Sequence, residues 1–236
     1  AQAAYYQAQR FADLFAHARR VPNSLANEIA SIPGVAALEM RVVADVLLDV
    51  PGLSEPATGR VVSLPEGGRP RLNDIYLRSG RLPFADESDA VVMSDAFAQA
   101  NGLALGDRLG AVLYGRWQSL RVVGTAVSPE FVYEIRGGGD IFPDNRRFGA
   151  LWMGRHALGT AFGLDGAAND LVIALAPGAV EADVLARLDR LLAPYGGRGA
   201  YGREDQISHR FLSDEIQETR VTSVLIPSIF LGVTAF

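Results

Sequence analysis

Residues 90–126 read AVVMSDAFAQANGLALGDRLGAVLYGRWQSLRVVGTA, a pattern of strand, short helix and hairpin that organises the middle of the chain. The β-branched run 90–93 predicts a strand, and Ser94 is a favourable N-cap for a brief helix that ends at Gly102. Residues 108–114 predict a second strand, and Gly115-Arg116 is typical of a hairpin turn into a strand over 117–127. We therefore expect a small β-rich lobe, inserted over residues 81–165.

The segments on either side of this lobe, 22–80 and 166–203, alternate helix and strand patterns. Together they are expected to form one α+β lobe, with a sheet that carries helices on one face. The best-defined helix is 180–193, which has an apolar stripe, acidic residues in its first turn and arginines in its last. The other predicted elements are a helix from Pro22 to Ile32, strands over 35–50, 59–64, 74–77 and 170–175, and a short strand over 198–201.

Both ends of the chain have amphipathic patterns. In residues 1–21, Phe11, Leu14, Phe15 and Ala18 follow the spacing of one helical face. A second amphipathic helix is predicted over 204–220. We expect the two helices to pair antiparallel as a stalk that couples the domain to a membrane, through contacts of Phe11, Leu14 and Phe15 with Ile207, Phe211 and Ile216.

The last 16 residues, 221–236, read VTSVLIPSIFLGVTAF and contain no charge. A spanning helix needs roughly 20 apolar residues, so this run is interpreted as the start of a transmembrane helix. The alternative is a buried core helix. Pro227 favours the membrane, because membrane helices tolerate proline better than soluble helices do.

The loop 128–149 is long for a connection inside a domain, and such loops are usually functional or disordered. It contains several large apolar side chains, which predict a contact surface for cargo or a partner subunit. The candidate contact residues are Phe131, Tyr133, Phe142 and Phe148. The alternative is that these aromatic side chains fold back and cap the β-rich lobe.

Residues with catalytic or ligand-binding chemistry are sparse. The chain has no cysteine, and His17, His156 and His209 lie far apart in the sequence. Neither a Walker A sequence nor a G-x-S-x-G motif is present. We therefore expect no catalytic, cofactor or metal site. The net charge of −5, without a basic block, argues against a nucleic-acid partner.

The strand, short helix and hairpin pattern of residues 90–124 carries a family resemblance. It contains Gly102, Gly106-Asp107 and a strand that ends at Val122-Val123-Gly124. Residues 90–124 resemble the extracytoplasmic domain of ABC transporter permeases of the MacB/FtsX type. The order of elements in the rest of the chain also follows this family. It holds for the segment 24–42, which reads SLANEIASIPGVAALEMRV, and for the apolar run after Arg220. The resemblance implies a porter-like α/β sandwich lobe, split in sequence, with an inserted β-rich lobe, between two transmembrane helices.

The resemblance also implies a function. Such a domain is not an enzyme; it couples ATP hydrolysis by a cytoplasmic ABC ATPase subunit to export or release of a substrate, or transmits motion. It implies a place in the bacterial inner membrane, with this domain in the periplasm or outside the cell. Further partners would be a second permease copy or a periplasmic protein. A membrane-tethered periplasmic sensor or enzyme domain remains the alternative.

Overall fold

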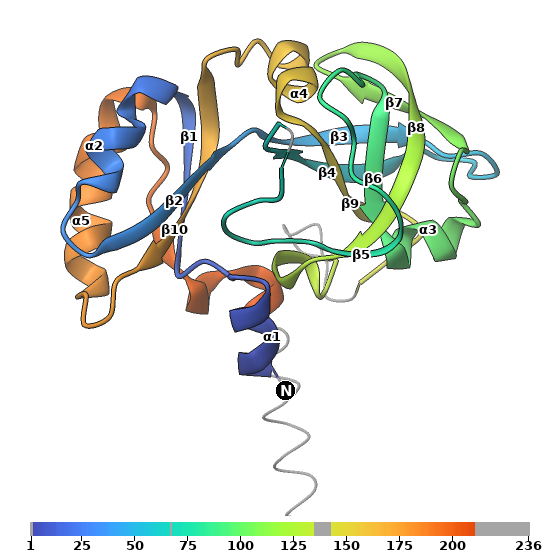
Figure 1. The fold of residues 1–236 in the computed structure, drawn as a ribbon. Coiled ribbons are helices and arrows are strands. Elements are labelled where there is room, and N and C mark those ends of the chain that lie inside the picture. The colour runs from blue at the N-terminus through green and yellow to red at the C-terminus, as the bar shows by residue number, and fades with distance from the viewer. Residues whose placement is uncertain (1, 67, 135–142, 211–236) are drawn as a thin grey trace, which may run out of the picture.

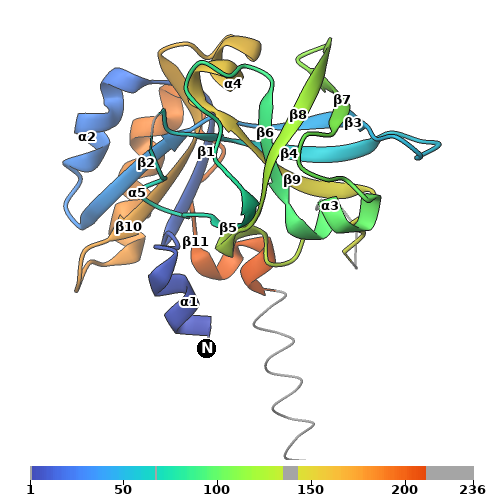
Figure 2. The ribbon, with the colours of Figure 1, turned by 45° about the vertical axis from the view of Figure 1, so that its right-hand side comes forward.

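Two β-sheets stand side by side in the computed structural model, which describes residues 2–66, 68–134 and 143–210 (Figure 1, Figure 2). One sheet has four strands and the other has seven. The molecule therefore has the mixed α+β class that the sequence predicts. We call the part built on the first sheet the layered lobe, and the part built on the second sheet the barrel lobe.

The layered lobe contains a sheet in the order β11-β1-β10-β2. Helices cover one face of this sheet, at the outer end of the molecule (Figure 1). The strands are β1 (Leu14–Pro22), β2 (Val35–Arg41), β10 (Ala167–Leu175) and β11 (Tyr201–Gly202); the helices are η1 (Asn23–Leu25), α2 (Ala26–Ala30), α5 (Glu181–Leu192) and η3 (Ala193–Tyr195).

The helix α5 packs on this sheet through a stripe of buried residues, Val184, Leu188 and Leu192. They share a core with Leu14 of β1 and Leu171 of β10. The opposite face of the sheet is covered as well, because the helix α1 (Gln2–Ala8) precedes β1 and its Tyr6 belongs to a cluster that includes Phe11, Phe15 and Val172. The strand β1 is thus buried on both faces.

The barrel lobe contains the sheet β5-β8-β6-β9-β4-β3-β7, and β7 also pairs with β8. This additional pairing closes six strands into a barrel. The strands are β3 (Val43–Asp49), β4 (Ala57–Leu64), β5 (Tyr76–Gly80), β6 (Ala90–Ser94), β7 (Arg108–Leu113), β8 (Arg116–Val127) and β9 (Phe148–Gly154); the helices are α3 (Asp95–Asn101), η2 (Pro129–Phe131), α4 (Arg155–Ala161) and, beyond the lobe, η4 (Arg203–Asp205).

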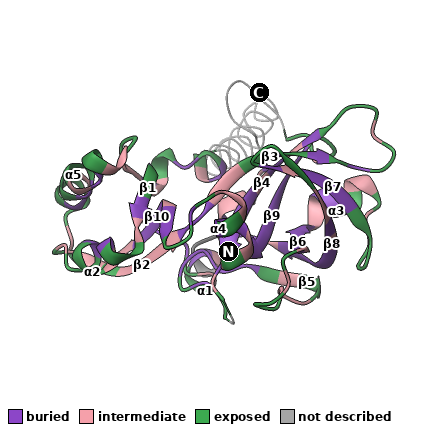
Figure 3. Ribbon diagram, turned by 90° about the horizontal axis from the view of Figure 1, so that it is seen from above, coloured by how far each residue is buried: buried purple, intermediate pink, exposed green. Residues whose placement is uncertain are grey.

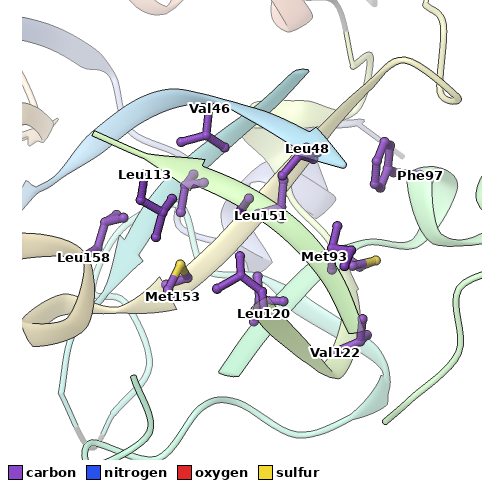
Figure 4. Close-up of a cluster of buried hydrophobic side chains, with 14 of the residues drawn as sticks. Val46, Leu48, Met93, Phe97, Leu113, Leu120, Val122, Leu151, Met153 and Leu158 are labelled. Atoms are coloured by element: carbon purple, nitrogen blue, oxygen red, sulfur yellow. The ribbon is translucent and has the colours of Figure 1, made fainter. Parts of the chain in front are cut away.

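Side chains from every strand of the closed barrel fill its interior, among them Leu48, Met93, Leu120 and Leu151 (Figure 4). Phe97 of α3 is fully buried at one end of this core. A Cβ atom on Gly149 would lie 2.4 Å from Cγ of the Phe97 ring, so glycine at this position lets the ring cap the barrel. Figure 3 shows buried residues along β8, β9 and β10.

The chain passes between the lobes at Val42, which has no exposed surface. Its backbone N–H donates to Ser63 Oγ at 2.9 Å. The return strand β10 is joined to the same place by Asn169. The Asn169 amide accepts from the Val43 N–H and donates to the Val43 carbonyl, both at 2.8 Å. One side chain thus holds the two connections of the barrel lobe together.

The predicted start of the inserted lobe is wrong, whereas its predicted end at residue 165 agrees with the structure, where β10 of the layered lobe begins at Ala167. The run 35–50 was expected to be one strand, but it forms β2 and β3, which belong to different sheets. The predicted strands 59–64 and 74–77 also lie in the barrel lobe, as β4 and β5. The insertion therefore begins at residue 43 and not at 81, and the barrel lobe has the larger of the two sheets.

The prediction of a helix over residues 1–21 is also wrong for the residues after Ala8. The helix α1 ends at Ala8, and Arg10 has a φ of 50°, which a continuing helix does not allow. The strand β1 follows from Leu14. The hairpin turn between β7 and β8 lies one residue earlier than expected, at Tyr114-Gly115, where both residues have positive φ as a type I′ turn requires.

Toward the other end, a helix begins at Ile207, within the predicted segment 204–220. Residues 211–220 lie outside the described part of the structure, as do the predicted transmembrane start 221–236 and Phe142. Among the helices of the described residues, none has the length and apolar character needed to cross a membrane.

Candidate functional site

A polar cleft of 360 Å³ lies between the two lobes. Its walls come from β1 and β10 of the layered lobe and from β3 and β4 of the barrel lobe. Its remaining sides are formed by the segments 130–133 and 206–208. The charged and hydrogen-bonding residues of its lining are His17, Asp45, Arg60, Glu130, Tyr133, Asn169, Asp170, Arg198, Tyr201, Gln206 and Ser208.

Arg41, at the end of β2, joins the two lobes beside this cleft. Its guanidinium donates to both carboxylate oxygens of Glu130, at 2.7 and 3.0 Å, and through Nε to Asp170 Oδ1 at 2.6 Å. Glu130 belongs to η2, next to the barrel lobe, and Asp170 to β10. Burial alone would lower the pKa of Arg41, but its attraction to Asp170 and Glu130 raises that pKa above its ordinary value.

Asp170 is 1% exposed and sits at the centre of this arrangement. Its Oδ2 lies 2.8 Å from His17 Nδ1. Burial would raise the pKa of Asp170, but the positive charge of Arg41 and the contact with His17 hold it below its ordinary value. On the far side of the imidazole, His17 Nε2 lies 3.4 Å from the Tyr201 hydroxyl.

These contacts make a continuous chain of polar groups that runs from Tyr201 to Glu130. Asn73 extends it, since its amide donates to Glu130 Oε2 at 2.8 Å. We call Arg41, Asp170, Glu130, His17 and Tyr201 the interlobe network. Both ring nitrogens of His17 face a partner, and the guanidinium of Arg41 is bound by two carboxylates. The network therefore links β1, β2, β10 and β11 of the layered lobe to η2 through one series of polar contacts.

The two described ends of the chain meet close to this network. Arg203 donates to the carbonyl oxygens of Phe11 and Ala12, at 2.7 and 2.8 Å, and to Asp13 Oδ1 at 2.6 Å. Its guanidinium also lies 5.1 Å from the centre of the Phe11 ring. The Tyr6 hydroxyl lies 3.1 Å from His209 Nδ1.

The same C-terminal segment contacts the loop that carries Glu130. The Gln206 amide donates to the Glu130 carbonyl at 2.8 Å, and Ser208 Oγ accepts from the Tyr133 N–H at 2.9 Å. We call the segments 6–13, 130–133 and 203–209 together the junction. The junction bonds to the layered lobe through Asp13 and to the interlobe network through Glu130.

The predicted stalk residues do not form a helix pair. Phe11 and Phe15 lie in the aromatic cluster with Tyr6, whereas Leu14 faces the opposite side of β1, toward α5. Ile207 is 40% exposed. The stalk interpretation is therefore wrong for Leu14 and Phe15, which belong to a strand; Phe211 and Ile216 lie outside the described residues.

The predicted contact residues of the loop 128–149 lie in different surroundings. Phe148 is 4% exposed within β9, so the prediction that it contacts cargo is wrong. Phe131 is half-buried and meets Trp152 edge-on, with the ring centres 6.1 Å apart. Tyr133 is half-buried in the junction.

The sequence interpretation missed the interlobe network altogether. The sequence does contain an indication of this network. Arg41 and Asp170 are charged residues inside otherwise apolar strand patterns, LEMRVV and NDLVIAL. Charged side chains in such positions are almost never buried unless they are paired. Across the described residues, no group of three His, Cys, Asp or Glu side chains could hold a metal ion.

No protein-family model matches this chain, and no curated protein matches it in sequence. Its structure is similar to the periplasmic region of MacB from Actinobacillus actinomycetemcomitans, with a TM-score of 0.49 and 12% identity, over 90% of this chain and 95% of that one. It is also similar to the extracellular domain of the noncanonic ABC-type transporter YknZ from Gram-positive bacteria (TM-score 0.49, 12% identity, 81% and 98% covered).

A third similar structure is a domain assigned to a permease protein from Porphyromonas gingivalis, with a TM-score of 0.43 and 12% identity, over 82% of this chain and 90% of that one. The identity is the same low value in all three cases.

Proposed function

We propose that this chain is the extracytoplasmic, non-enzymatic domain of an ABC transporter permease in a bacterial cytoplasmic membrane. In this proposal a cytoplasmic ABC ATPase supplies the energy, and the domain passes the resulting motion to an exported or released substrate. One observation carries the proposal: the junction brings both described ends of the chain together and bonds them to both lobes. The sequence resemblance over residues 90–124 supports it.

The junction suits the transmission of a displacement. A shift of the helix that begins at Ile207 moves Gln206, whose amide is bonded to the Glu130 carbonyl. The Glu130 carboxylate is bonded to Arg41, and Arg41 to Asp170 in the middle of the four-stranded sheet. Buried charge-assisted hydrogen bonds are short and costly to break, so such a chain of contacts would move as a unit.

Copurification tests the proposed class of protein. The intact membrane protein that contains this chain is to be extracted in a mild detergent, and its partners identified by mass spectrometry. We expect an ABC ATPase subunit, or an ATPase domain in the same polypeptide. A protein that lacks both would overturn the proposal.

A substitution in the junction tests the proposed coupling. Gln206→Leu removes the bond to Glu130, so in the reconstituted transporter we expect ATP hydrolysis to continue while the ATP-dependent movement of the lobes is lost. That movement can be followed between single labels on introduced cysteines, because the chain has none of its own. The matched control is Gln7→Leu on the exposed side of α1, which should keep both activities.

A further inference from the structure

A second cavity, of 240 Å³, lies on the other side of the loop that carries Glu130. It is smaller than the roughly 300–1,000 Å³ of pockets for drug-sized ligands, so it suits a compact molecule. Its walls are mainly apolar and come from four separate parts of the chain. Its lining includes Tyr5 of α1, Ala96 of α3, Phe131, Val132, Trp152 of β9 and Glu134.

Glu134 is the carboxylate-bearing residue in the lining of this pocket, and it is 5% exposed. Its carboxylate accepts a hydrogen bond from Ser94 Oγ at 2.8 Å and another from the backbone N–H of Ala150 in β9. Within the described part of the chain, no arginine or histidine is hydrogen-bonded or ion-paired with it. Asp95, the neighbouring charged residue on α3, adds a second negative charge. Burial, the largest cause, and Asp95 together raise the pKa of Glu134 to about 7.

Glu130 and Glu134 lie in the same loop but differ in whether a cationic side chain pairs with them. Glu130 is also turned toward the interior, but its charge is neutralised by the guanidinium of Arg41 at 2.7 Å. Glu134 follows four residues later, next to aromatic rings and with no cation from its own chain among the described residues. An ionised carboxylate in such surroundings is stabilised by a cationic partner.

We propose that this pocket binds a compact organic ammonium ion, with its cationic head at Glu134 and its apolar body against Trp152 and Phe131. The carboxylate supplies the charge, and the indole face attracts an ammonium group through its quadrupole. The rings of Phe131 and Trp152 meet edge-on, which leaves them as two differently oriented walls. This proposal stands apart from the transport function, since binding can be measured on the chain itself.

The pocket provides its own spectroscopic signal. The chain has two tryptophans, and Trp117 is 62% exposed on the barrel surface, so Trp117→Phe leaves Trp152 as the single reporter. Phenethyltrimethylammonium is a suitable ligand because its charge does not depend on pH. Its uncharged carbon analogue, 3,3-dimethylbutylbenzene, has the same shape. We expect the cation to change the Trp152 fluorescence at concentrations at which the neutral compound does not.

Two substitutions locate the site. Glu134→Gln should weaken binding of the cation by about tenfold or more, since the charged contact is lost. Ala96→Phe should block the apolar part of the pocket without touching the carboxylate. The control Glu55→Gln removes the same charge from the surface, where Glu55 has 66% of its side chain exposed, and should leave binding unchanged.

Binding should also strengthen between pH 5 and pH 8 in the parent, because Glu134 ionises over that range. The groups that face it are Asp95 from α3, Ser94 from β6 and Tyr5 from α1; burial raises the pKa of Tyr5 to about 12, so this phenol stays neutral throughout. Equal affinity for the neutral compound, unchanged affinity in Glu134→Gln, or no binding of the cation to a folded parent would each overturn the proposal.

Discussion

The barrel lobe and the layered lobe form their buried cores from differently arranged parts of the chain. The barrel strands β3 to β9 come from one continuous stretch and close on themselves, so they enclose their own core. The layered sheet is assembled from two distant stretches of the chain, and β1 and β10 are buried on both faces. Its second face is covered in part by the junction.

The difference indicates where the molecule is sensitive to its surroundings. The core of the barrel lobe comes almost entirely from residues 43–164, whereas the layered lobe depends on α1 and on residues 201–209. The chain ends are thus bonded directly to both lobes, to the layered sheet through Asp13 and to the barrel-side loop through Gln206 and Glu130. Arg41 joins Glu130 back to the layered sheet at Asp170.

The largest effect is expected where the lobes are joined. Arg41→Ala leaves Glu130 and Asp170 buried without their guanidinium, and breaking a buried ion pair costs about 3–5 kcal/mol. We expect that loss in the free energy of unfolding, measured with urea. The control Arg60→Ala removes an exposed pair with Asp45 and should cost less than about 1 kcal/mol. Equal losses for the two variants would show that the interlobe network contributes no more than a surface pair.

The independence of the barrel lobe is tested by a cavity in the layered lobe. Leu188→Ala removes a fully buried side chain between α5 and the four-stranded sheet, and we expect a loss of about 3 kcal/mol. Both tryptophans, Trp117 and Trp152, lie in the barrel lobe, so their fluorescence follows that lobe alone. The variant should lower the midpoint of the far-ultraviolet circular dichroism transition and leave the fluorescence midpoint in place.

The matched variant is Leu151→Ala, which makes a cavity inside the barrel. Here the fluorescence midpoint should fall. If both probes shift together in both variants, the two lobes unfold as one cooperative unit, and the barrel lobe is not stable independently of the layered lobe.

Glu134 should give the barrel lobe a distinctive pH dependence. Its pKa is raised from 4.5 to about 7 in the folded protein. A raised pKa adds stability below pH 4.5, and this contribution is lost as the pH rises to about 7. Glu134→Gln does not titrate, so its stability relative to the parent should increase by about 3 kcal/mol between pH 4.5 and pH 8. A constant difference over this range would contradict the assignment.

The smallest effect is expected at the junction. Arg203→Ala removes the bonds to Phe11, Ala12 and Asp13, but the side chain is 29% exposed, so we expect a loss of about 1 kcal/mol. The loss should be local, with faster amide hydrogen exchange at residues 203–209 and unchanged exchange in the barrel. The control is Arg19→Ala on the exposed side of β1. Unchanged exchange in Arg203→Ala would show that other contacts hold the junction.

Elements with a clear period and clear ends could be predicted from the sequence. The helix predicted over 180–193 corresponds to α5, and the strands predicted over 90–93 and 170–175 correspond to β6 and β10 within a few residues. In each of them the apolar spacing and the flanking turn residues agree with the final packing. Local sequence was sufficient there, because the burial of one face decides the structure.

The failures have a common physical cause. Phe11, Leu14 and Phe15 have helical spacing, but β1 is buried on both faces, and such a strand looks as continuously apolar as a helix. In residues 35–50 the apolar run does not indicate that the chain passes from one sheet to the other at Val42. Val42 itself is fully buried, so the apolar pattern continues without a break through the crossing. Long-range partners decide both cases. The same holds for Arg41 and Asp170, which are 129 residues apart.

The amide of Asn169, bonded to both backbone groups of Val43, has a consequence for the history of such chains. It fixes the distance between the points at which the polypeptide leaves the layered sheet and returns to it. A segment grafted there would need two ends that meet this spacing, as domain insertions require, and a carboxylate in the place of Glu130 to pair with Arg41. Recombination that kept both features would exchange whole barrels on the same four-stranded sheet.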